Sequence, residues 1–246
     1  MLTGKLAVVT GGGSGIGRAV CQRLSNHGAK VIVADMNKSA AMDTVNILGA
    51  SNDHVAFACD VSKSDEVAKL FEFTLGQNPS PPSIVVNCAG ITRDSTLLKM
   101  SEKNFDDVVA VNLKGVYLVT QAFAKAAVTQ KVPLSVVNVS SIVGKVGNFG
   151  QCNYSATKAA VVAFGKSAAK ELSAKGVRVN TIMPGFIRTP MTAAMPEKVL
   201  ASICAQIPMG RMGEPDDIAD AVLFLSSDLS SYMTGATVEV TGGLHM

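Results

Sequence analysis

The chain lacks the sequence features of several protein classes. Its three histidines form no H-E-x-x-H or other metal-ligand spacing, and none of its five cysteines lies in a C-x-x-C pair. The sequence therefore predicts no metal site, and the odd, widely spaced cysteines favour a reducing compartment over a disulfide framework. No run of lysine or arginine accompanies the net charge of +3, which argues against binding to nucleic acid.

Long apolar runs, repeats and linkers are missing as well. No apolar run has the length of a membrane span, so the sequence predicts none. Only Met1 to Lys5 precede the first apolar run, so we expect no removable presequence of ordinary length. No internal repeat, low-complexity tract or Gly/Ser-rich linker divides the chain, so we expect residues 1–246 to form a single domain.

The sequence does contain a regular alternation of short apolar runs and longer helical patterns. The apolar runs are expected to form strands at residues 6–10, 31–35, 55–59, 83–87, 134–140, 177–183 and 237–240. Nearly continuous apolar strands suit a parallel sheet that is covered on both faces. The sequence therefore predicts an α/β fold with a doubly wound, Rossmann-type parallel sheet of about seven strands and helices on both faces.

A glycine-rich turn follows the first of these strands and leads into a helix from about Gly15. Residues 10–17 have the spacing T-G-x-x-x-G-x-G, and the stricter G-x-G-x-x-G is absent. Glycines in such a turn let a pyrophosphate approach the backbone N–H groups and the positive end of the helix dipole. We expect a dinucleotide to bind here, and a purely structural turn is the alternative.

Asp35 ends the second predicted strand, where an acidic side chain can accept hydrogen bonds from the hydroxyls of an adenosine ribose. Its charge would disfavour the 2′-phosphate of NADP by ~2 kcal/mol or more. Ser14 stands where a basic side chain could have reached that phosphate. The sequence therefore predicts NAD as the cofactor, and the alternative is that Asp35 is a solvated helix cap.

Tyr154 and Lys158 lie at the start of a strongly helical stretch, and their spacing of four places them on one face. A phenol with a pKa of about 10 keeps its proton at neutral pH unless a positive charge stabilises the phenolate. We expect Tyr154 to be the acid and base of a hydride transfer, with Lys158 beside it. Ser141 could hold the substrate oxygen, and Ser140 competes for that role.

Other polar residues follow strands or interrupt apolar stretches. Asn112 stands in an apolar helical stretch, where an amide is costly unless it is paired. It is either a satisfied core amide or the holder of a water that relays protons from Lys158. Asp60, Val61 and residues 87–90 follow the third and fourth strands at their carboxyl ends, where open sheets bind ligands.

Taken together, these residues resemble the short-chain dehydrogenase/reductase family over the whole chain. The resemblance is carried by residues 10–17 and 87–90 and by Asn112, Ser141, Tyr154, Lys158 and Pro184-Gly185. Within the family, residues 90–94 and 141–148, Gln151 and residues 240–243 resemble the 3-oxoacyl-carrier-protein reductases. Residues 81–83, 111–115 and 241–244 are similar to the type 8 17-beta-hydroxysteroid dehydrogenases of that group.

The resemblance implies NAD-dependent interconversion of 3-oxoacyl and (3R)-3-hydroxyacyl thioesters of coenzyme A or acyl carrier protein, with estradiol as a further substrate. It implies catalytic roles for Asn112, Ser141, Tyr154 and Lys158. It implies cofactor contacts from Gly11, Ser14, Gly15, Ile16, Gly17, Asp35, Met36, Asp60, Val61, Asn87, Ala89, Gly90, Tyr154, Lys158, Ile187 and Thr189. Cys88, in place of a second asparagine, and Arg188 depart from the family pattern.

The resemblance also implies a tetramer with carbonyl reductase type 4 as a partner, and a place in the mitochondrial matrix, with the cytosol as the alternative. Residues from about 186 to 211 are expected to form a lid over an apolar substrate, because they carry Met191, Met195, Ile203 and Met209. The same four residues would equally suit a core.

Three lysines are candidates for recruiting the substrate. Lys131, Lys170 and Lys175 are candidates for gathering near the entrance of the site and attracting the phosphates of coenzyme A or acyl carrier protein, and the alternative is that they serve only solubility. The competing hypotheses are a dedicated steroid dehydrogenase and a non-catalytic scaffold that senses the nucleotide. The intact set of Ser141, Tyr154 and Lys158 argues against the scaffold.

Overall fold

The computed structural model describes residues 1–49, 53–78, 80–193 and 197–245. Within them, seven parallel strands form one sheet in the order β3-β2-β1-β4-β5-β6-β7. The strands are β1 (Leu6–Thr10), β2 (Lys30–Asp35), β3 (Val55–Ala58), β4 (Ile84–Asn87), β5 (Leu134–Val139), β6 (Val177–Pro184) and β7 (Thr237–Val240). The predicted doubly wound parallel sheet is confirmed, and every predicted strand end agrees to within one residue.

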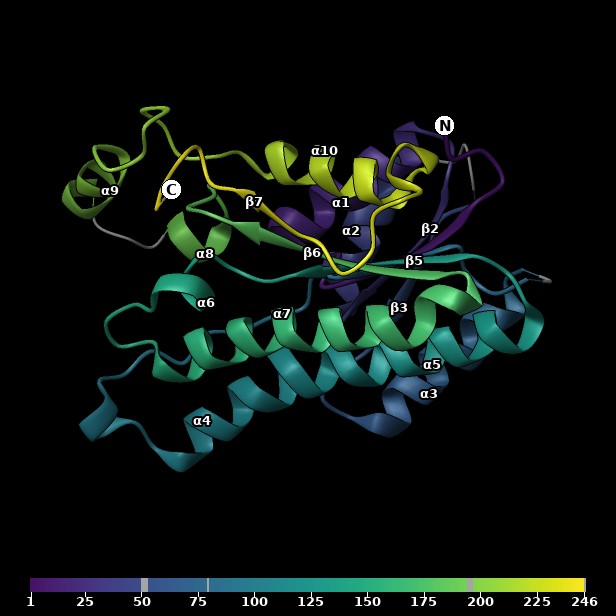
Figure 1. The fold of residues 1–246 in the computed structure, drawn as a ribbon, viewed down its shortest axis with the longest axis horizontal. Helices are drawn as coiled ribbons and strands as arrows, with labels where there is room; N and C mark the ends of the chain where they lie inside the picture. Colours follow the sequence, from purple (N-terminus) through teal and green to yellow (C-terminus); the bar gives the residue numbers. More distant parts are fainter. Residues whose placement is uncertain (50–52, 79, 194–196, 246) are drawn as a thin grey trace.

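Helices cover both faces of the sheet, and strand residues alternate between those faces (Figure 1). One face carries α1 (Gly15–Asn26), α2 (Lys38–Leu48) and α10 (Pro215–Ser226). The other carries α3 (Ser64–Gly76), α5 (Val116–Gln130) and α7 (Cys152–Leu172). Ala7 and Val9 of β1 pack with the first group, whereas Leu6 and Val8 pack with the second.

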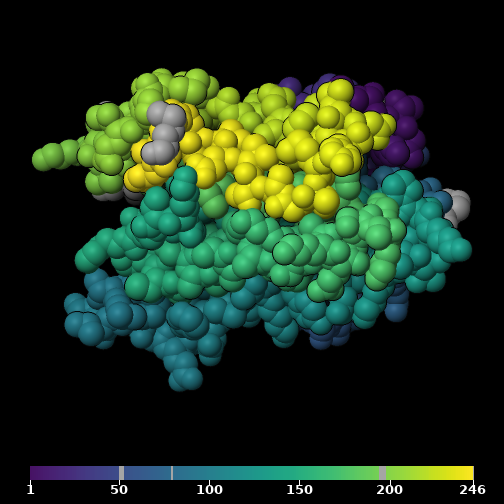
Figure 2. Space-filling model, viewed as in Figure 1, coloured from purple at the N-terminus to yellow at the C-terminus, as the bar shows by residue number. Residues whose placement is uncertain are grey.

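Helices α1 and α10, the first and last helices on their face of the sheet, pack against each other. Because α1 and α10 share one apolar cluster, the N-terminal and C-terminal parts of the chain, purple and yellow in Figure 2, occupy the same side of the molecule. The middle of the chain, in teal and green, covers the opposite side. Both ends of the sequence therefore contribute to one layer over the sheet.

The order of the strands reverses between β1 and β4. The chain runs outward from β1 through β2 and β3, then returns to β4 and continues outward to β7. In an open parallel sheet such a reversal leaves a crevice at the carboxyl ends of the two central strands. Three short helices lie at the left of Figure 1 near that edge: α6 (Val143–Val146), α8 (Pro190–Ala193) and α9 (Glu197–Cys204).

The helix that leads into α5 contains a wider turn. A π-helical segment, η2 (Ala110–Gly115), joins α4 (Glu102–Val109) to α5, whereas the sequence predicted a regular helix here. At Gly115 a Cβ would lie 2.7 Å from Cγ2 of Val61, so glycine lets this turn pack against the loop that follows β3. Such π-helical turns are frequent at functional sites, and this one carries Asn112. The remaining short helices are η1 (Leu97–Lys99), η3 (Ser173–Lys175) and η4 (Asp228–Ser230).

Two absences apply to the part of the chain that the structure describes. No helix there is both long enough and apolar enough to cross a lipid bilayer. No three histidine, cysteine or acidic side chains gather there in a way that could hold a metal ion.

Candidate active site

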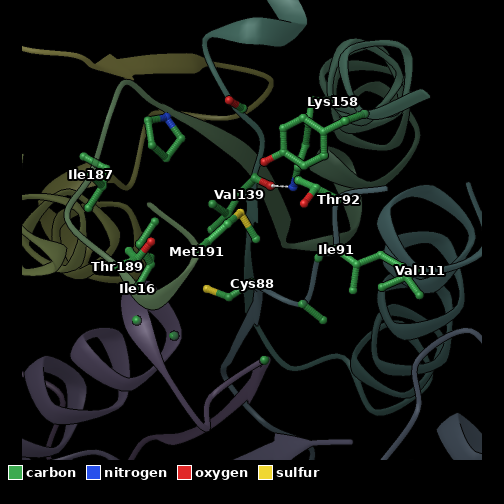
Figure 3. A pocket seen from close by; sticks show the side chains of 18 of the residues that line it. Ile16, Cys88, Ile91, Thr92, Val111, Val139, Lys158, Ile187, Thr189 and Met191 are labelled. Carbon is green, nitrogen blue, oxygen red and sulfur yellow. Dashed lines mark hydrogen bonds between the residues drawn. The ribbon is translucent and has the colours of Figure 1, made fainter. Parts of the chain in front are cut away.

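A cleft of about 540 Å³ opens at the carboxyl ends of the central strands, which is a typical size for a cofactor or small-molecule site. Glycines of the turn after β1 and side chains of α7 both line it. Figure 3 shows Ile16, Thr189 and Lys158 around the same space. The predicted site residues in its wall are Gly11, Ser14, Gly15, Ile16, Gly17, Asp35, Met36, Asp60, Val61, Ala89, Gly90, Ser141, Tyr154, Lys158, Ile187 and Thr189.

The turn requires glycines because neighbouring backbone atoms lie too close to leave room for a Cβ. A Cβ at Gly11 would lie 2.7 Å from the Ala89 nitrogen, and a Cβ at Gly17 would collide with the Gly11 carbonyl oxygen. Gly15 begins α1 with a φ of +49°, opposite Thr189. Ser14, the N-cap residue, makes no side-chain cap hydrogen bond. The N-terminal end of α1 thus faces the cleft, and it fits the pyrophosphate of a dinucleotide.

Asp35 is held beside this turn. Its carboxylate accepts hydrogen bonds from the N–H groups of Gly13 and Asn37, each at 2.9 Å. The alternative that Asp35 caps the next helix is wrong, because the N-cap of α2 is Asn37, whose side chain accepts from the Ala40 N–H. The carboxylate therefore stands where an adenosine ribose would reach it. Met36, the next residue, is exposed at the edge of the cleft.

Tyr154 and Lys158 lie next to each other on α7, as their spacing predicts. The Lys158 Nζ is 5.5 Å from the centre of the Tyr154 ring and donates a hydrogen bond to the Val139 carbonyl at 2.8 Å (Figure 3). The lysine is only 4% exposed, and this burial lowers its pKa to about 8. At neutral pH Lys158 thus still carries its charge, although burial works against it.

Burial acts in the opposite direction on the phenol. It raises the pKa of Tyr154 to about 12, and the charge of Asp94 adds to that rise while the Ser141 hydroxyl opposes it. The charge of Lys158 alone therefore does not turn Tyr154 into a phenolate. The phenol keeps its proton at neutral pH, which is the state that can protonate a carbonyl oxygen.

The structure separates the roles of the two serines after β5. The Ser140 hydroxyl is buried and donates to the Lys158 carbonyl oxygen at 2.7 Å, which ties β5 to α7. The Ser141 side chain lines the cleft, accepts from the Val143 N–H at 3.4 Å and lies close enough to the Tyr154 phenol to lower its pKa. Ser141 is therefore the serine that is placed to bind a substrate oxygen.

Two predicted site residues lie behind the wall of the cleft. Asn112 is fully buried, and its amide accepts from the Ile91 N–H at 2.9 Å and donates to the Ile91 carbonyl at 3.0 Å. These contacts support the satisfied core amide, which anchors the loop after β4. Asn87 donates to the Asn138 side chain at 2.8 Å and does not line the cleft. The Asn87 side chain therefore links β4 and β5, and its contact with a cofactor stays a prediction.

The two departures from the family pattern lie in different surroundings. Cys88 lines the cleft, and burial raises the pKa of its thiol to about 12, so it stays a neutral thiol. Arg188 pairs with Glu214 at 3.0 Å on the surface and is not part of the cleft wall. Neither residue places a charge next to Tyr154.

The three candidate lysines lie at the far ends of their helices. Lys131 follows α5, Lys170 is in the last turn of α7, and Lys175 is in η3. Lys170 is sixteen residues beyond Tyr154, which is about 24 Å along a helix. The expectation that these lysines gather at the entrance of the same chain's cleft is therefore wrong.

The predicted lid divides into parts with different surroundings. Met191, in α8, lines the cleft, whereas Ile203 is half-buried in α9 and Met209 is exposed. Met195 lies outside the described residues. Residues 186, 187 and 189–192 thus border the cleft, and closure of this segment over a ligand stays a prediction.

Sequence reasoning from single residues missed the polar side chains at the mouth of the cleft. Asp94, Asn148 and Gln151 line it next to Tyr154 and are connected by hydrogen bonds. Asp94 and Gln151 are 57 residues apart in the chain, so no local pattern could have paired them. Their only signal in the sequence was that both lie in segments that resemble the family.

A family model described as enoyl-(acyl carrier protein) reductase matches residues 11–245. The chain belongs to the short-chain dehydrogenase/reductase family. This confirms the predicted family and the prediction of an oxidoreductase.

Relatives of this short-chain dehydrogenase align over nearly its full length. The (3R)-3-hydroxyacyl-CoA dehydrogenase of Canis lupus familiaris is 52% identical over 100% of this chain and 98% of its own. The 3-oxoacyl-[acyl-carrier-protein] reductase of Thermotoga maritima is 42% identical over 99% and 98%. A solved structure, a putative 2-deoxy-D-gluconate 3-dehydrogenase from Agrobacterium tumefaciens with bound NADP, is 34% identical with a TM-score of 0.91 over 99% and 97%.

Proposed function

We propose that this short-chain dehydrogenase interconverts 3-oxoacyl and (3R)-3-hydroxyacyl thioesters and uses NAD(H) as its cofactor. The observation that carries the proposal is the half-buried Tyr154 beside the buried Lys158 in the wall of the cleft, together with Ser141. The relatives support the substrate class, since the canine protein is named as a dehydrogenase of (3R)-3-hydroxyacyl-CoA and the Thermotoga protein as a reductase of 3-oxoacyl-[acyl-carrier-protein].

Each of the three side chains has a separate task in this proposal. A nicotinamide bound in the cleft supplies or accepts the hydride. The Tyr154 phenol donates its proton to the carbonyl oxygen during reduction and takes a proton from the alcohol during oxidation. The Ser141 hydroxyl holds that oxygen beside the phenol. Lys158, anchored on the Val139 carbonyl, keeps a positive charge next to the ring.

The protonation states favour reduction at neutral pH. A phenol with a pKa raised to about 12 is fully protonated at neutral pH, so the proton donor for reduction is present without any prior change of ionisation. Oxidation needs the phenol as a proton acceptor, and we therefore expect its rate to rise with pH. Because Lys158 loses its charge above a pH of about 8, the rise should weaken at higher pH.

The choice of NAD over NADP rests on charge at the end of β2. Asp35 brings a carboxylate to the ribose position, and Met36 brings no positive charge to balance a 2′-phosphate. Arg18 does not supply it, because its guanidinium donates to the Thr44 hydroxyl and the Gly13 carbonyl behind the turn. A repulsion of about 2 kcal/mol corresponds to a preference for NAD of about 30-fold.

Steady-state kinetics with paired substrates and cofactors tests the proposal. We expect reduction of acetoacetyl-CoA and longer 3-oxoacyl-CoA thioesters, with kcat/KM higher for NADH than for NADPH by about 30-fold. Turnover of estradiol without turnover of any 3-oxoacyl thioester would overturn the proposed substrate class.

The cofactor preference has its own variant. Asp35→Asn keeps an oxygen that can accept hydrogen bonds from the loop but removes the charge, so we expect the ratio of NADH to NADPH to fall about tenfold or more. Asp43→Asn, on the exposed surface of α2, is the matched control. An unchanged ratio in Asp35→Asn would leave the electrostatic explanation without support.

A further inference from the structure

The mouth of the cleft carries a carboxylate that the proposed chemistry does not use. Asp94 lines the cleft beside Tyr154, and its charge contributes to the raised pKa of that phenol. No lysine, arginine or histidine among the described residues forms a salt bridge with it. The Asp94 carboxylate is exposed, so water screens its charge in part, but no ion pair among the described residues neutralises it.

Hydrogen bonds fix the position of this carboxylate. The Gln151 side chain donates to the Asp94 carboxylate at 2.9 Å and accepts from the Asn148 amide, also at 2.9 Å. The Ser95 N–H donates to the Gly150 carbonyl at 2.8 Å, which joins the two loops through their backbones. Gln151 is the N-cap residue of α7, the helix that carries Tyr154. Asp94 and the phenol are therefore parts of one connected unit.

A third link connects the same loop to the residue before the phenol. Asn153 is fully buried, donates to the Arg93 carbonyl at 3.0 Å and accepts from the Tyr154 N–H at 2.7 Å. The neighbouring Arg93 guanidinium turns to the Thr92 carbonyl at 2.9 Å. Arg93, although it is next to Asp94 in the sequence, therefore does not pair with the Asp94 carboxylate.

The charges that line the cleft are unequal. Among its lining residues, Asp35, Asp60 and Asp94 are acidic, and Lys158 is the basic one. Lys158 is buried and directed to the Val139 carbonyl. Asp35 ends β2 and Asp60 follows β3, both on the glycine-turn side of the sheet, so Asp94 is the lining carboxylate that acts on Tyr154. A second negative charge bound beside the phenol would be repelled.

We propose that Asp94, held by Gln151 and Asn148, excludes substrates with a free carboxylate and so selects acyl groups masked as neutral thioesters. The inference rests on the proposed function. In a 3-oxo acid the carboxylate is separated from the reacting carbonyl carbon by a single CH₂ group, so binding the carbonyl at Tyr154 brings both negative charges together. In the thioester the same carbon skeleton is neutral there, and the repulsion is absent.

The test compares acetoacetate with its neutral N-acetylcysteamine thioester, which share the reacting carbonyl. We measure kcat/KM for both with NADH in the wild type, in Asp94→Asn and in the control Glu102→Gln, an exposed carboxylate of α4 outside the cleft wall. Asn keeps the oxygen that accepts from Gln151. We expect Asp94→Asn to lower the ratio of thioester to free acid by about fivefold, the size typical of an exposed charge pair, through a lower KM for acetoacetate, and Glu102→Gln to leave the ratio unchanged.

The outcomes separate the two proposals. An unchanged ratio in Asp94→Asn, including an equal loss on both substrates from a disturbed loop, overturns the charge filter. A wild type that reduces neither these compounds nor any 3-oxoacyl-CoA thioester overturns the proposed function instead. In that case calorimetric binding of acetoacetate and methyl acetoacetate to the enzyme with cofactor tests the filter alone, and equal relative affinities in wild type and Asp94→Asn overturn it.

Discussion

Replacing Lys158 by methionine separates the cost of the buried charge from its use in catalysis. The side chain is 4% exposed, and burial lowers its pKa from 10.5 to about 8. A shift of this size corresponds to about 3 kcal/mol of folding free energy below a pH of about 8. Met lacks the charge but also leaves the Val139 carbonyl without its donor, which costs about 1–3 kcal/mol. At neutral pH we therefore expect Lys158→Met to be as stable as the wild type or up to about 2 kcal/mol more stable.

The pH dependence of the free energy of unfolding distinguishes the wild type from Lys158→Met more clearly than a measurement at one pH. Below a pH of about 8 both the folded and the unfolded chain bind the Lys158 proton, so the burial cost is at its full value. As pH rises from about 8 towards 10.5, the folded chain releases this proton before the unfolded chain does. The group's contribution to the free energy of unfolding then increases by about 1.4 kcal/mol per pH unit. Between pH values of about 7 and 9.5, the free energy of unfolding of the wild type should therefore rise by about 2 kcal/mol relative to that of Lys158→Met.

Urea unfolding followed by circular dichroism measures these differences. Lys166→Met, on the exposed side of the same helix, is the control for loss of a lysine at the surface. Activity should fall about 100-fold or more in Lys158→Met only, because the charge beside the phenol is lost. A stability difference between wild type and Lys158→Met that stays constant over this pH range would refute the reasoning.

Three further predictions follow from single contacts. Tyr154→Phe keeps the ring and loses the proton donor, so turnover should fall by a factor of about 100 or more while titration of NADH fluorescence shows unchanged binding; normal turnover would assign the acid to another group. Gly17→Ala forces a Cβ against the Gly11 carbonyl and should cost about 1–3 kcal/mol in thermal unfolding, whereas Gly76→Ala, with open space around its Cβ, should not. His54 accepts from the Val31 N–H at 3.0 Å, and burial lowers its pKa. The free energy of unfolding should therefore be highest above a pH of about 6.5 and decline as pH falls, because the folded chain resists protonation of this imidazole. An equal decline in His54→Asn would contradict this explanation.

The fold could be predicted from sequence because each step was local. Strands of a covered parallel sheet are nearly continuous apolar runs, and the glycine turn and Asp35 stand at strand ends that the sheet brings to one edge. The pairing of Tyr154 with Lys158 needed only the pitch of a helix.

Sequence reasoning was less informative where the result depended on the direction of a side chain or on distant partners. Asn87 ends a strand at the expected edge, yet its side chain turns to Asn138 of the neighbouring strand. A sequence shows that a residue is at a strand end, but not which partner its amide finds. Lys170 was misplaced because its distance from Tyr154 depends on the length of α7 between them. The π-helical turn at Asn112 likewise reflects packing of Gly115 on Val61, two segments far apart in the chain.

The buried ammonium explains why so many main-chain contacts converge on the start of α7. Lys158 has a carbonyl as its hydrogen-bond partner and no salt bridge among the described residues, and a carboxylate in that place would cancel the charge that the phenol needs. The helix is instead held by neutral links, from Ser140 to the Lys158 carbonyl and from Asn153 to the Arg93 carbonyl. Such links fix the geometry without changing the local charge. Asp94, the remaining carboxylate near the phenol, is held at the mouth of the cleft by Gln151, where it meets the substrate and not the ammonium.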